Sequence, residues 1–365
     1  MPHTSPEALK AATALKAAKM YYLQDLTMGA IASELRTSRS SVSRLLSYAR
    51  ESGLVDIRIT SPFDRGSALE QAIHERFGVT AHVVPMPESI SDVDRLERVA
   101  MTAGRILGGF VDSNMVVGVA WGSTVGAISR HLVAKPVHNT VVVQLNGAGN
   151  TQTTGIDYAS EILQRFSAAY SAQIQQFPVP AFFDDPRTKE GLWRERSTKR
   201  LLDIQARLDL ALFGLGSPFA EIPSQVYIGG YLDAEDYRSL SEDGAVGDVA
   251  TVFYRPDGTS SDIALNSRAS GPSLDRLRKV ARRVCVVSGV QKLASLRGAL
   301  AAGLITDLVL DESLASRVVE PDGRVSESAQ SLSLIHISEP TRRTPISYAV
   351  FCLKKHQTLF FTKVS

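Results

Sequence analysis

The chain has 365 residues, of which 44% are hydrophobic and 21% are charged, and its formal net charge is +2. This composition is typical of a folded globular protein and excludes a disordered, collagen-like or disulfide-rich chain. At about 150 residues per domain, the length predicts one small and one large domain. Because the net charge is small, we expect any surface that binds nucleic acid to be local.

Cysteine and histidine usage argues against a disulfide or a metal site. Cys285 lies in an apolar run, Cys352 lies near the end of the chain, and the histidines lack metal-ligand spacing. The N-terminus lacks the basic and apolar segments of an export signal, and the sequence contains no run of about 18 apolar residues. We therefore expect a cytoplasmic protein without a metal, a cofactor or a membrane contact.

Three helices are predicted in the first sixty residues. Apolar residues recur at helical spacing over residues 8–25, 28–35 and 39–52. Residues 54–60 then alternate apolar and polar side chains, a pattern typical of an exposed strand. The same sixty residues contain eight Lys or Arg against five Asp or Glu, which is a modest local excess of positive charge.

The second and third of these helices have the signals of a helix-turn-helix. Thr27 is the expected N-cap of the second helix, Ser38 or Thr37 is the expected N-cap of the third, and Gly53 ends it. Apolar residues on the inner faces allow both helices to pack around the turn between them. These inner residues are Ala30, Ile31, Leu35, Val42, Leu45 and Leu46.

The third helix leaves polar side chains exposed on its front half, where a recognition helix meets base edges in the major groove. Arg39 and Arg44 are the expected base readers, because small hydroxyl residues around them allow close approach. The predicted DNA-binding residues are Thr27, Ser38, Arg39, Ser40, Ser41, Ser43, Arg44 and, on the following strand, Arg58. The alternative is a surface rich in serine and arginine on an ordinary helical hairpin.

From residue 61 the pattern changes to strand, glycine-bearing loop and helix. Most strand candidates are continuous apolar runs, as expected where helices cover both faces of a parallel sheet. Strands are predicted at residues 81–84, 115–119, 140–145, 210–213, 249–254, 284–287 and 304–310. Helices are predicted among them at residues 92–107, 157–170 and 189–208. This region is therefore expected to be an α/β domain.

Three loops place glycine beside a hydroxyl or an amide directly after a predicted strand. These loops are AWGST at 120–124, NGAG at 146–149 and GLGS at 214–217. The carboxyl ends of parallel strands meet at one edge of a sheet, where free backbone N–H groups can bind a phosphate. Gly122, Ser123 and Thr124 are the favoured candidates. Each loop alone is equally compatible with a tight turn that binds nothing, but three together favour a site.

A similarity to a known family runs through residues 21–59, YYLQDLTMGAIASELRTSRSSVSRLLSYARESGLVDIRI. This segment resembles the N-terminal domain of the SorC/DeoR-type sugar-binding transcriptional regulators, with the tyrosines, the recognition helix and a wing after it in register. One difference is Arg36, which stands where such motifs usually have glycine. We therefore expect a residue with a Cβ to adopt an unfavourable backbone conformation in the turn.

The same family's effector domain is similar to residues 247–258, GDVATVFYRPDG, and 263–300, IALNSRASGPSLDRLRKVARRVCVVSGVQKLASLRGAL. That domain resembles the glucosamine-phosphate deaminase and ribose-phosphate isomerase fold. The resemblance covers about residues 8–325. It implies a small winged helix-turn-helix domain followed by a Rossmann-like α/β effector domain that binds a sugar phosphate.

The resemblance also implies roles for individual residues. Ser123 and Thr124 would hold a phosphate, with Gly214, Gly216 and Ser217 on the rim and Asp248, Asn266 and Lys292 facing the sugar. With the glycines of the three loops, the predicted effector-binding residues are Gly122, Ser123, Thr124, Gly147, Gly214, Gly216, Ser217, Asp248, Asn266 and Lys292. Family members often have LND where this chain has LNS, so the missing acid alters the expected hydroxyl contacts. For Lys292, a solvated helix lysine is an equal alternative.

The expected domains are a DNA-binding domain at residues 1–60 and a sugar-phosphate-sensing and oligomerisation domain at 61–328. Residues 331–365 break the α/β pattern and resemble a translated sequencing-adapter read, so we expect a non-native tail; the alternative is a genuine tail.

These features predict a transcriptional regulator of carbohydrate metabolism whose binding to double-stranded operator DNA is controlled by a phosphorylated sugar or polyol. A palindromic operator requires at least a dimer, and the resemblance implies a tetramer. The first alternative is a sugar-phosphate isomerase or deaminase, with Asp248 or Asp262 as the proton-transfer group. The second alternative is a DNA-binding protein whose large domain only oligomerises.

Overall fold

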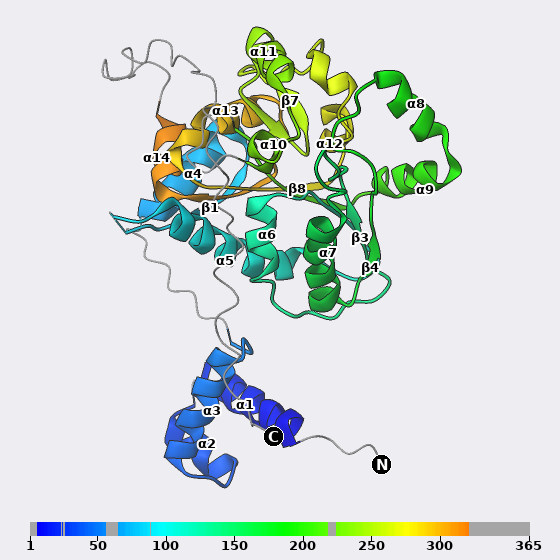
Figure 1. Ribbon diagram of the computed structural model, residues 1–365. Coiled ribbons are helices and arrows are strands. Elements are labelled where there is room, and N and C mark those ends of the chain that lie inside the picture. The colour runs from blue at the N-terminus through cyan, green and yellow to red at the C-terminus, as the bar shows by residue number, and fades with distance from the viewer. Residues whose placement is uncertain are drawn as a thin grey trace, which may run out of the picture. The chain divides into compact units, whose positions relative to one another are not determined.

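The structure is a computed structural model that describes residues 6–22, 24, 26–55, 65–87, 89–217 and 224–320 (Figure 1). The predicted wing from Asp56 onward, Arg58, Cys352 and the segment 331–365 lie outside the described residues. Among the helices that are described, none is long and apolar enough to cross a membrane. The same residues contain no group of three or more His, Cys, Asp or Glu side chains that could hold a metal ion.

The N-terminal region consists of three helices, α1 (Pro6–Tyr22), α2 (Met28–Glu34) and α3 (Arg39–Glu51). They bury a common core made of Ala14, Ala17, Ala18, Met20, Ile31, Ala32, Val42, Leu46 and Ala49. Leu35 and Leu45 are half-buried against this core. The predicted inner position of Ala30 is wrong, because that side chain is exposed and Ala32 takes the inward position.

Local side-chain chemistry defines the start of α2, the turn and the start of α3. Thr27 Oγ1 accepts a hydrogen bond from the N–H of Ala30 at 3.2 Å, and Ser38 Oγ accepts one from Ser41 at 3.1 Å. Both predicted N-caps are therefore confirmed. Arg36, in the turn, has a φ of 49°. This is the left-handed conformation that glycine adopts easily, and Arg36 was expected to take it because it stands where such turns usually have glycine.

The α/β domain is built on a sheet of seven strands in the order β1-β9-β8-β5-β2-β3-β4, and every neighbouring pair is parallel. Its strands are β1 (Thr80–Val84), β2 (Val116–Val119), β3 (Val141–Gln144), β4 (Gln173–Gln175), β5 (Leu210–Gly214), β8 (Arg282–Val287) and β9 (Asp307–Asp311). The chain runs outward from β2 through β3 to β4 and then returns to the opposite side of β2 with β5. The direction of winding therefore reverses between β2 and β5.

Helices cover both faces of this sheet (Figure 1). One layer consists of α5 (Asp92–Phe110), α6 (Ser123–Ser129) and α7 (Ile156–Tyr170). The opposite layer contains α4 (Arg65–Phe77), α12 (Leu274–Arg278), α13 (Leu293–Ala301) and α14 (Glu312–Val319). The remaining helices are α8 (Pro186–Arg194), α9 (Arg196–Gln205), α10 (Gln225–Ile228), α11 (Ala234–Glu242) and the short 3-10 helices η1 (Ala264–Ser267) and η2 (Val290–Lys292).

The two helix layers explain why the central strands carry apolar side chains at consecutive positions. On β5, Leu212 belongs to the core under α5, α6 and α7, while its neighbour Phe213 belongs to the core on the other side. The same alternation holds on β8 for Val284 and Cys285. Successive side chains of a strand point to opposite faces, so a sheet covered twice needs apolar residues at both.

Three sequence-based expectations for this domain are corrected by the structure. The predicted strand 249–254 is an antiparallel hairpin of β6 (Gly247–Val249) and β7 (Val252–Tyr254) outside the main sheet. Ala250 and Thr251 have φ values of 47° and 71°, and this backbone reverses the chain. The predicted helix 189–208 is two helices, α8 and α9, because Glu195 between them is extended with a ψ of 139°. The short edge strand β4 was not predicted, because Gln-Ile-Gln has little apolar signal.

Candidate functional site

A cavity lies at the point where the winding of the sheet reverses. The loop after β2 and the loop after β5 leave the same edge of adjacent strands, and Val119 of β2 lies opposite Leu212 of β5. Both loops line the cavity, which matches the general position of ligand sites in open parallel sheets. We call it the β2–β5 cavity. Its lining consists of Ala120, Trp121, Gly122, Ser123, Thr124, Val125, Asn146, Gly214, Leu215, Gly216, Ser224, Val226, Asp248, Ala250, Thr251 and Lys292.

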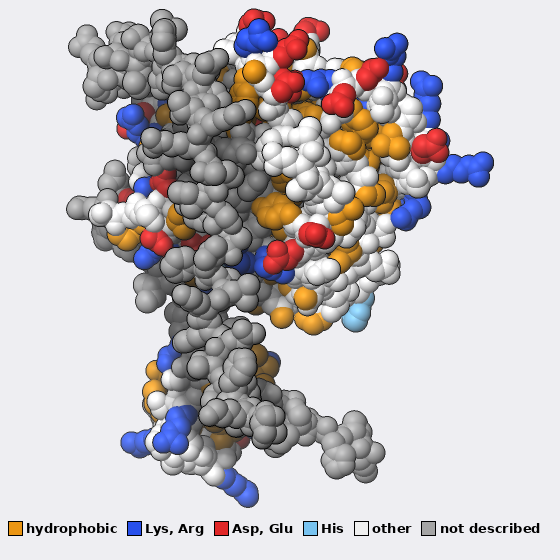
Figure 2. All heavy atoms as spheres, viewed as in Figure 1, with side chains coloured by type: hydrophobic (Ala, Val, Ile, Leu, Met, Phe, Trp, Pro, Cys, Tyr) orange, Lys and Arg blue, Asp and Glu red, His pale blue; other side chains and the backbone are white. Residues whose placement is uncertain are grey.

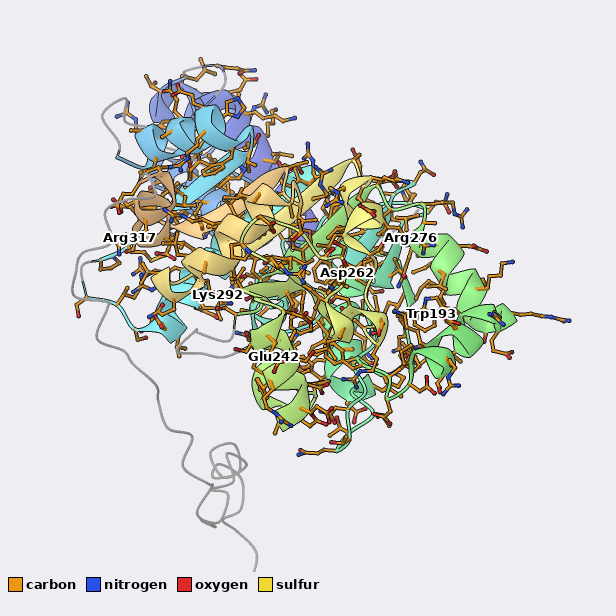
Figure 3. All side chains as sticks on the ribbon, turned by 90° about the horizontal axis from the view of Figure 1, so that it is seen from above. Trp193, Glu242, Asp262, Arg276, Lys292 and Arg317 are labelled. Atoms are coloured by element: carbon orange, nitrogen blue, oxygen red, sulfur yellow. The ribbon has the colours of Figure 1, made fainter. Side chains whose placement is uncertain are left out.

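Seven of the predicted effector-binding residues meet in this cavity, although they come from four separate segments of the chain. They are Gly122, Ser123, Thr124, Gly214, Gly216, Asp248 and Lys292. Asp248 reaches the cavity from the β6–β7 hairpin, and Lys292 reaches it from η2. In Figure 3, the labelled Lys292 lies within the body of the domain, whereas Trp193 lies out on α8.

Two glycines are required by the backbone of the cavity. Gly122 has a φ of 136°, a conformation that side chains with a Cβ rarely adopt, and it starts the turn into α6. Gly216 approaches Asp248 so closely that a Cβ would lie 1.7 Å from the Oδ1 atom of the carboxylate. Gly216 and Asp248 also pair through their backbones. The GLGS loop therefore needs glycine in order to let the acid into the cavity.

Asp248 and Lys292 form the electrostatic centre of the β2–β5 cavity. Both are almost completely buried, at 4% and 8% exposure. Asp248 Oδ2 accepts a hydrogen bond from the N–H of Thr251 at 3.2 Å, whereas Oδ1 has no hydrogen-bond partner among the described residues. Lys292 Nζ donates to the carbonyl oxygen of Leu215 at 2.9 Å. Within the described part of the chain, Asp248 Oδ1 therefore has no geometric hydrogen-bond partner, and the Lys292 ammonium donates to one protein oxygen.

Burial shifts the titration of both groups. It raises the pKa of the Asp248 carboxyl to about 6, against the opposing effects of the backbone N–H of Thr251, the hydroxyl of Tyr227 and the charge of Lys292. Burial also lowers the pKa of the Lys292 ammonium, which the charge of Asp248 partly offsets. Burial therefore destabilises the charged form of both side chains, and a polar ligand that hydrogen-bonds to them would reduce this cost.

Trp121 forms part of the wall of the β2–β5 cavity. Trp121 stacks on Tyr231 with 5.1 Å between the ring centroids, and its Nε1 donates to the carbonyl oxygen of Gly147 at 2.7 Å. Sequence reasoning missed Trp121 as a lining residue, although it directly precedes Gly122. It also missed Asn146, the residue before the predicted Gly147. Both residues lie in the glycine-bearing loops that the sequence analysis had singled out, and this position could have identified them.

Three predicted effector residues are not part of the cavity lining. Gly147 is packed so tightly that a Cβ would lie 2.2 Å from the carbonyl oxygen of Val179. The Asn266 amide holds β7, since its Oδ1 accepts from the N–H of Phe253 at 2.7 Å and its Nδ2 donates to the carbonyl oxygen of Phe253 at 2.9 Å. Ser217, the last residue of the GLGS loop, is fully buried. These positions favour support of the loops over direct contact with a ligand.

The predicted DNA-binding side chains lie together on α3. Arg39, Ser40, Ser43 and Arg44 are exposed, and Ser41 is half-buried. The hydroxyl of Ser38 exchanges hydrogen bonds with those of Ser40 and Ser41 at 2.8 and 2.9 Å. The Arg39 guanidinium lies against the backbone of Gly29, where a Cβ would be 2.9 Å from its Nη2 atom. Thr27 is exposed beside them and caps α2.

Comparisons with known proteins agree with this arrangement. The Sugar-bind family model, which describes a sugar-binding domain, matches residues 61–320. The deoxyribonucleoside regulator of Bacillus subtilis (strain 168) is 32% identical over 308 residues, which cover 84% of this chain and 96% of the relative. The chain belongs to the SorC/DeoR-type sugar-binding transcriptional regulators. The sorbitol operon regulator of Klebsiella pneumoniae is 24% identical over 307 residues, or 84% of this regulator and 97% of the relative.

Solved structures place the fold in the same family. A domain of a possible sugar-binding transcriptional regulator from Arthrobacter aurescens TC1 is 55% identical, has a TM-score of 0.67, and covers 72% of this regulator and 100% of that chain. The full-length sorbitol operon regulator SorC from Klebsiella pneumoniae shares the fold, with a TM-score of 0.64 over 85% of this regulator and 99% of that chain. These relatives are transcriptional regulators, not enzymes. Asp262, the other candidate for proton transfer, is exposed and does not line the cavity (Figure 3).

Proposed function

We propose that this regulator binds operator DNA through α3 and that a phosphorylated sugar or polyol in the β2–β5 cavity controls that binding. The proposal rests on the buried Oδ1 of Asp248, which has no hydrogen-bond partner among the described residues and lies in the same cavity as the Lys292 ammonium. A buried polar atom without a partner is costly, so a ligand that supplies a donor is favoured there. Sugars and polyols carry such donors on each hydroxyl group.

The phosphate is assigned to the part of the lining formed by Ser123 and Thr124. Their hydroxyl groups lie beside Gly122 and Gly214, which have no side chain to cover the backbone. Lys292 adds the positive charge, since its ammonium donates to only one protein oxygen within the described residues. Hydroxyls, glycine backbone and one cation are the usual components of a phosphate site.

On the DNA side, the proposal assigns base contacts to Arg39 and Arg44 and phosphate contacts to the surrounding hydroxyls. Arginine fits the O6 and N7 atoms of guanine in the major groove, while serine hydroxyls bind phosphate oxygens without sequence preference. Arg58 is proposed as a further contact from the wing. A palindromic operator then requires at least two copies of the chain.

Two measurements test the two halves separately. A panel of paired sugars and sugar phosphates is screened by thermal shift, and a phosphorylated member should raise the melting temperature while its unphosphorylated partner does not. An electrophoretic mobility shift with DNA from upstream of the regulator's own gene should then show retardation that the same compound changes. If no member of the panel stabilises the protein while DNA binding is intact, the alternative of a large domain that only oligomerises is favoured. Turnover of ribose 5-phosphate or glucosamine 6-phosphate would instead revive the enzyme alternative.

A further inference from the structure

Three buried side-chain oxygens that line the β2–β5 cavity have no hydrogen-bond partner among the described residues. They are Asn146 Oδ1, Ser224 Oγ and Asp248 Oδ1. Asn146 is as deeply buried as the acid, since only 2% of its surface is exposed. A buried polar atom without a partner destabilises a protein, so three of them in one cavity indicate a ligand that supplies the missing bonds.

The chemistry of these oxygens defines what the ligand has to offer. An amide oxygen and an ionised carboxylate oxygen only accept hydrogen bonds, whereas a serine hydroxyl accepts or donates. The missing partners are therefore donors, such as the hydroxyl or amino groups of a sugar. A phosphate or carboxylate group offers acceptors, and beside Asn146 and Asp248 it would bring oxygen against oxygen.

The backbone around the Asn146 side chain is fixed by buried hydrogen bonds. Gln144 Nε2 donates to the carbonyl oxygen of Asn146 at 2.7 Å. The next residue, Gly147, donates its N–H to Ser270 Oγ at 2.9 Å, and its carbonyl oxygen accepts from Trp121 Nε1 at 2.7 Å. The amide is therefore held at the cavity before a ligand arrives, which lowers the entropic cost of binding.

The charge of the lining limits how many anionic groups the cavity accepts. Figure 2 shows acidic and basic side chains spread over the visible surface of the α/β domain, whereas the described residues that line the cavity include one base, Lys292, and one acid, Asp248. One phosphate ester carries a charge of about −1.5 to −2 at neutral pH, which already exceeds the charge of Lys292. A second anionic group would find no further cation among these residues and would share the cavity with the Asp248 carboxylate.

We propose that Asn146 determines the specificity of the β2–β5 cavity, which selects phosphate monoesters whose other polar groups are hydroxyl or amino groups. Bisphosphates and phosphorylated sugar acids are rejected. Asn146 acts in two ways, because its amide oxygen accepts a donor of the ligand and its neutral side chain leaves a second anion without a counter-charge. The inference rests on the proposed function, from which it takes the phosphate beside Ser123 and Thr124, and it adds the limit to one anionic group.

Isothermal titration calorimetry of the full chain at neutral pH tests this selectivity with matched pairs of ligands. The pairs are fructose 6-phosphate with fructose 1,6-bisphosphate, and glucose 6-phosphate with 6-phosphogluconate. In the pair that binds, the member with one anionic group should bind at least about tenfold more tightly than the member with two. Equal or tighter binding of the doubly anionic member overturns the inference and leaves the proposed function standing, whereas binding of no phosphorylated compound removes both.

Asn146→Ala tests whether the amide acts on the ligand or on the fold. Because the amide oxygen has no partner among the described residues, the unliganded variant should keep the melting temperature of the wild type. Its affinity for the preferred monophosphate should fall about tenfold. An amide with a purely structural role predicts the reverse, a lower melting temperature with unchanged affinity, and that result would overturn the inference.

Asn146→Lys tests the charge limit, because it adds a second cation to the lining. The preference for the monophosphate over the bisphosphate should fall at least about tenfold, through tighter binding of the bisphosphate. The matched control is Gln152→Lys, which adds the same charge at an exposed glutamine between β3 and α7 that does not line the cavity. An unchanged preference in Asn146→Lys, or an equal change in Gln152→Lys, would contradict the role given to Asn146.

Discussion

The helices proposed to bind DNA and the β2–β5 cavity place their candidate functional residues in opposite ways. The proposed DNA contacts of α3 lie within six consecutive residues, Arg39 to Arg44, on one helix whose N-cap is Ser38. The cavity draws its polar groups from the loops after β2 and β5, from the β6–β7 hairpin and from η2, between residues 122 and 292. A local site depends on one helix, whereas an assembled site depends on the whole sheet.

This difference has consequences for how each region fails when it is changed. In the helix-turn-helix, a surface substitution removes one contact and leaves the fold unchanged. In the cavity, Gly216, Asp248 and Lys292 depend on one another through close approach and burial, so a substitution affects binding and folding together.

The largest effect is expected from the charge on Asp248. Its pKa in the folded protein is raised from 3.8 to about 6, so the proton stabilises the fold, and this contribution is complete below pH 3.8 and lost as the pH rises through about 6. A difference of about two pKa units corresponds to about 3 kcal/mol. Urea unfolding at several pH values should show wild type losing about 2.4 kcal/mol relative to Asp248→Asn between pH 4 and pH 7. Parallel pH curves for the two proteins would contradict the assignment.

Gly216→Ala should destabilise the cavity by about 2 kcal/mol, because the added Cβ collides with the Asp248 carboxylate. The matched control is Gly109→Ala on α5, where no atom lies within 4 Å of the new Cβ. Alanine in a helix is favoured over glycine, so the control should be neutral or stabilising. Thermal unfolding of both variants measures the difference. Equal melting temperatures would show that the GLGS loop shifts to accommodate the Cβ without loss of stability.

Arg39→Ala should weaken specific DNA binding by about 2 kcal/mol without lowering the melting temperature. Mobility shifts at fixed salt on the operator and on single-base variants measure the effect. Loss of discrimination at one base pair identifies a base contact, whereas equal weakening on every sequence assigns Arg39 to phosphate. Lys16→Ala, an exposed lysine on α1, is the control for a general loss of positive charge.

The smallest effect is expected from Ser38→Ala, which removes the N-cap of α3 and its bonds to Ser40 and Ser41. Loss of an N-cap costs about 1 kcal/mol. Ser38→Asn keeps a side-chain acceptor and should restore most of that stability, as measured by thermal unfolding. A fall in DNA affinity that Asn does not restore would indicate that the hydroxyl itself contacts the DNA.

Sequence reasoning succeeded where the signal was local and was incomplete where it was not. The caps Thr27 and Ser38 and the strained turn at Arg36 were predicted from neighbouring residues, and the structure confirms them. Asn266 was assigned to the sugar site from the resemblance, but its amide holds the backbone of Phe253. Nothing within a few residues of Asn266 distinguishes these roles, because the partner lies across a tertiary contact.

The amino-acid sequence alone determined the family, the helix-turn-helix signals and the glycine loops that follow the strands. These features can be recognised in short stretches of sequence, because backbone preference and hydrophobic periodicity determine local structure there. Tertiary structure decided the strand order, and with it the choice of the β2 and β5 loops over that of β3 as the principal walls of the cavity. It also decided the hairpin that brings in Asp248 and the burial of Asn146. Packing between segments that are distant in the sequence determines these features, so they cannot be predicted from a local sequence pattern.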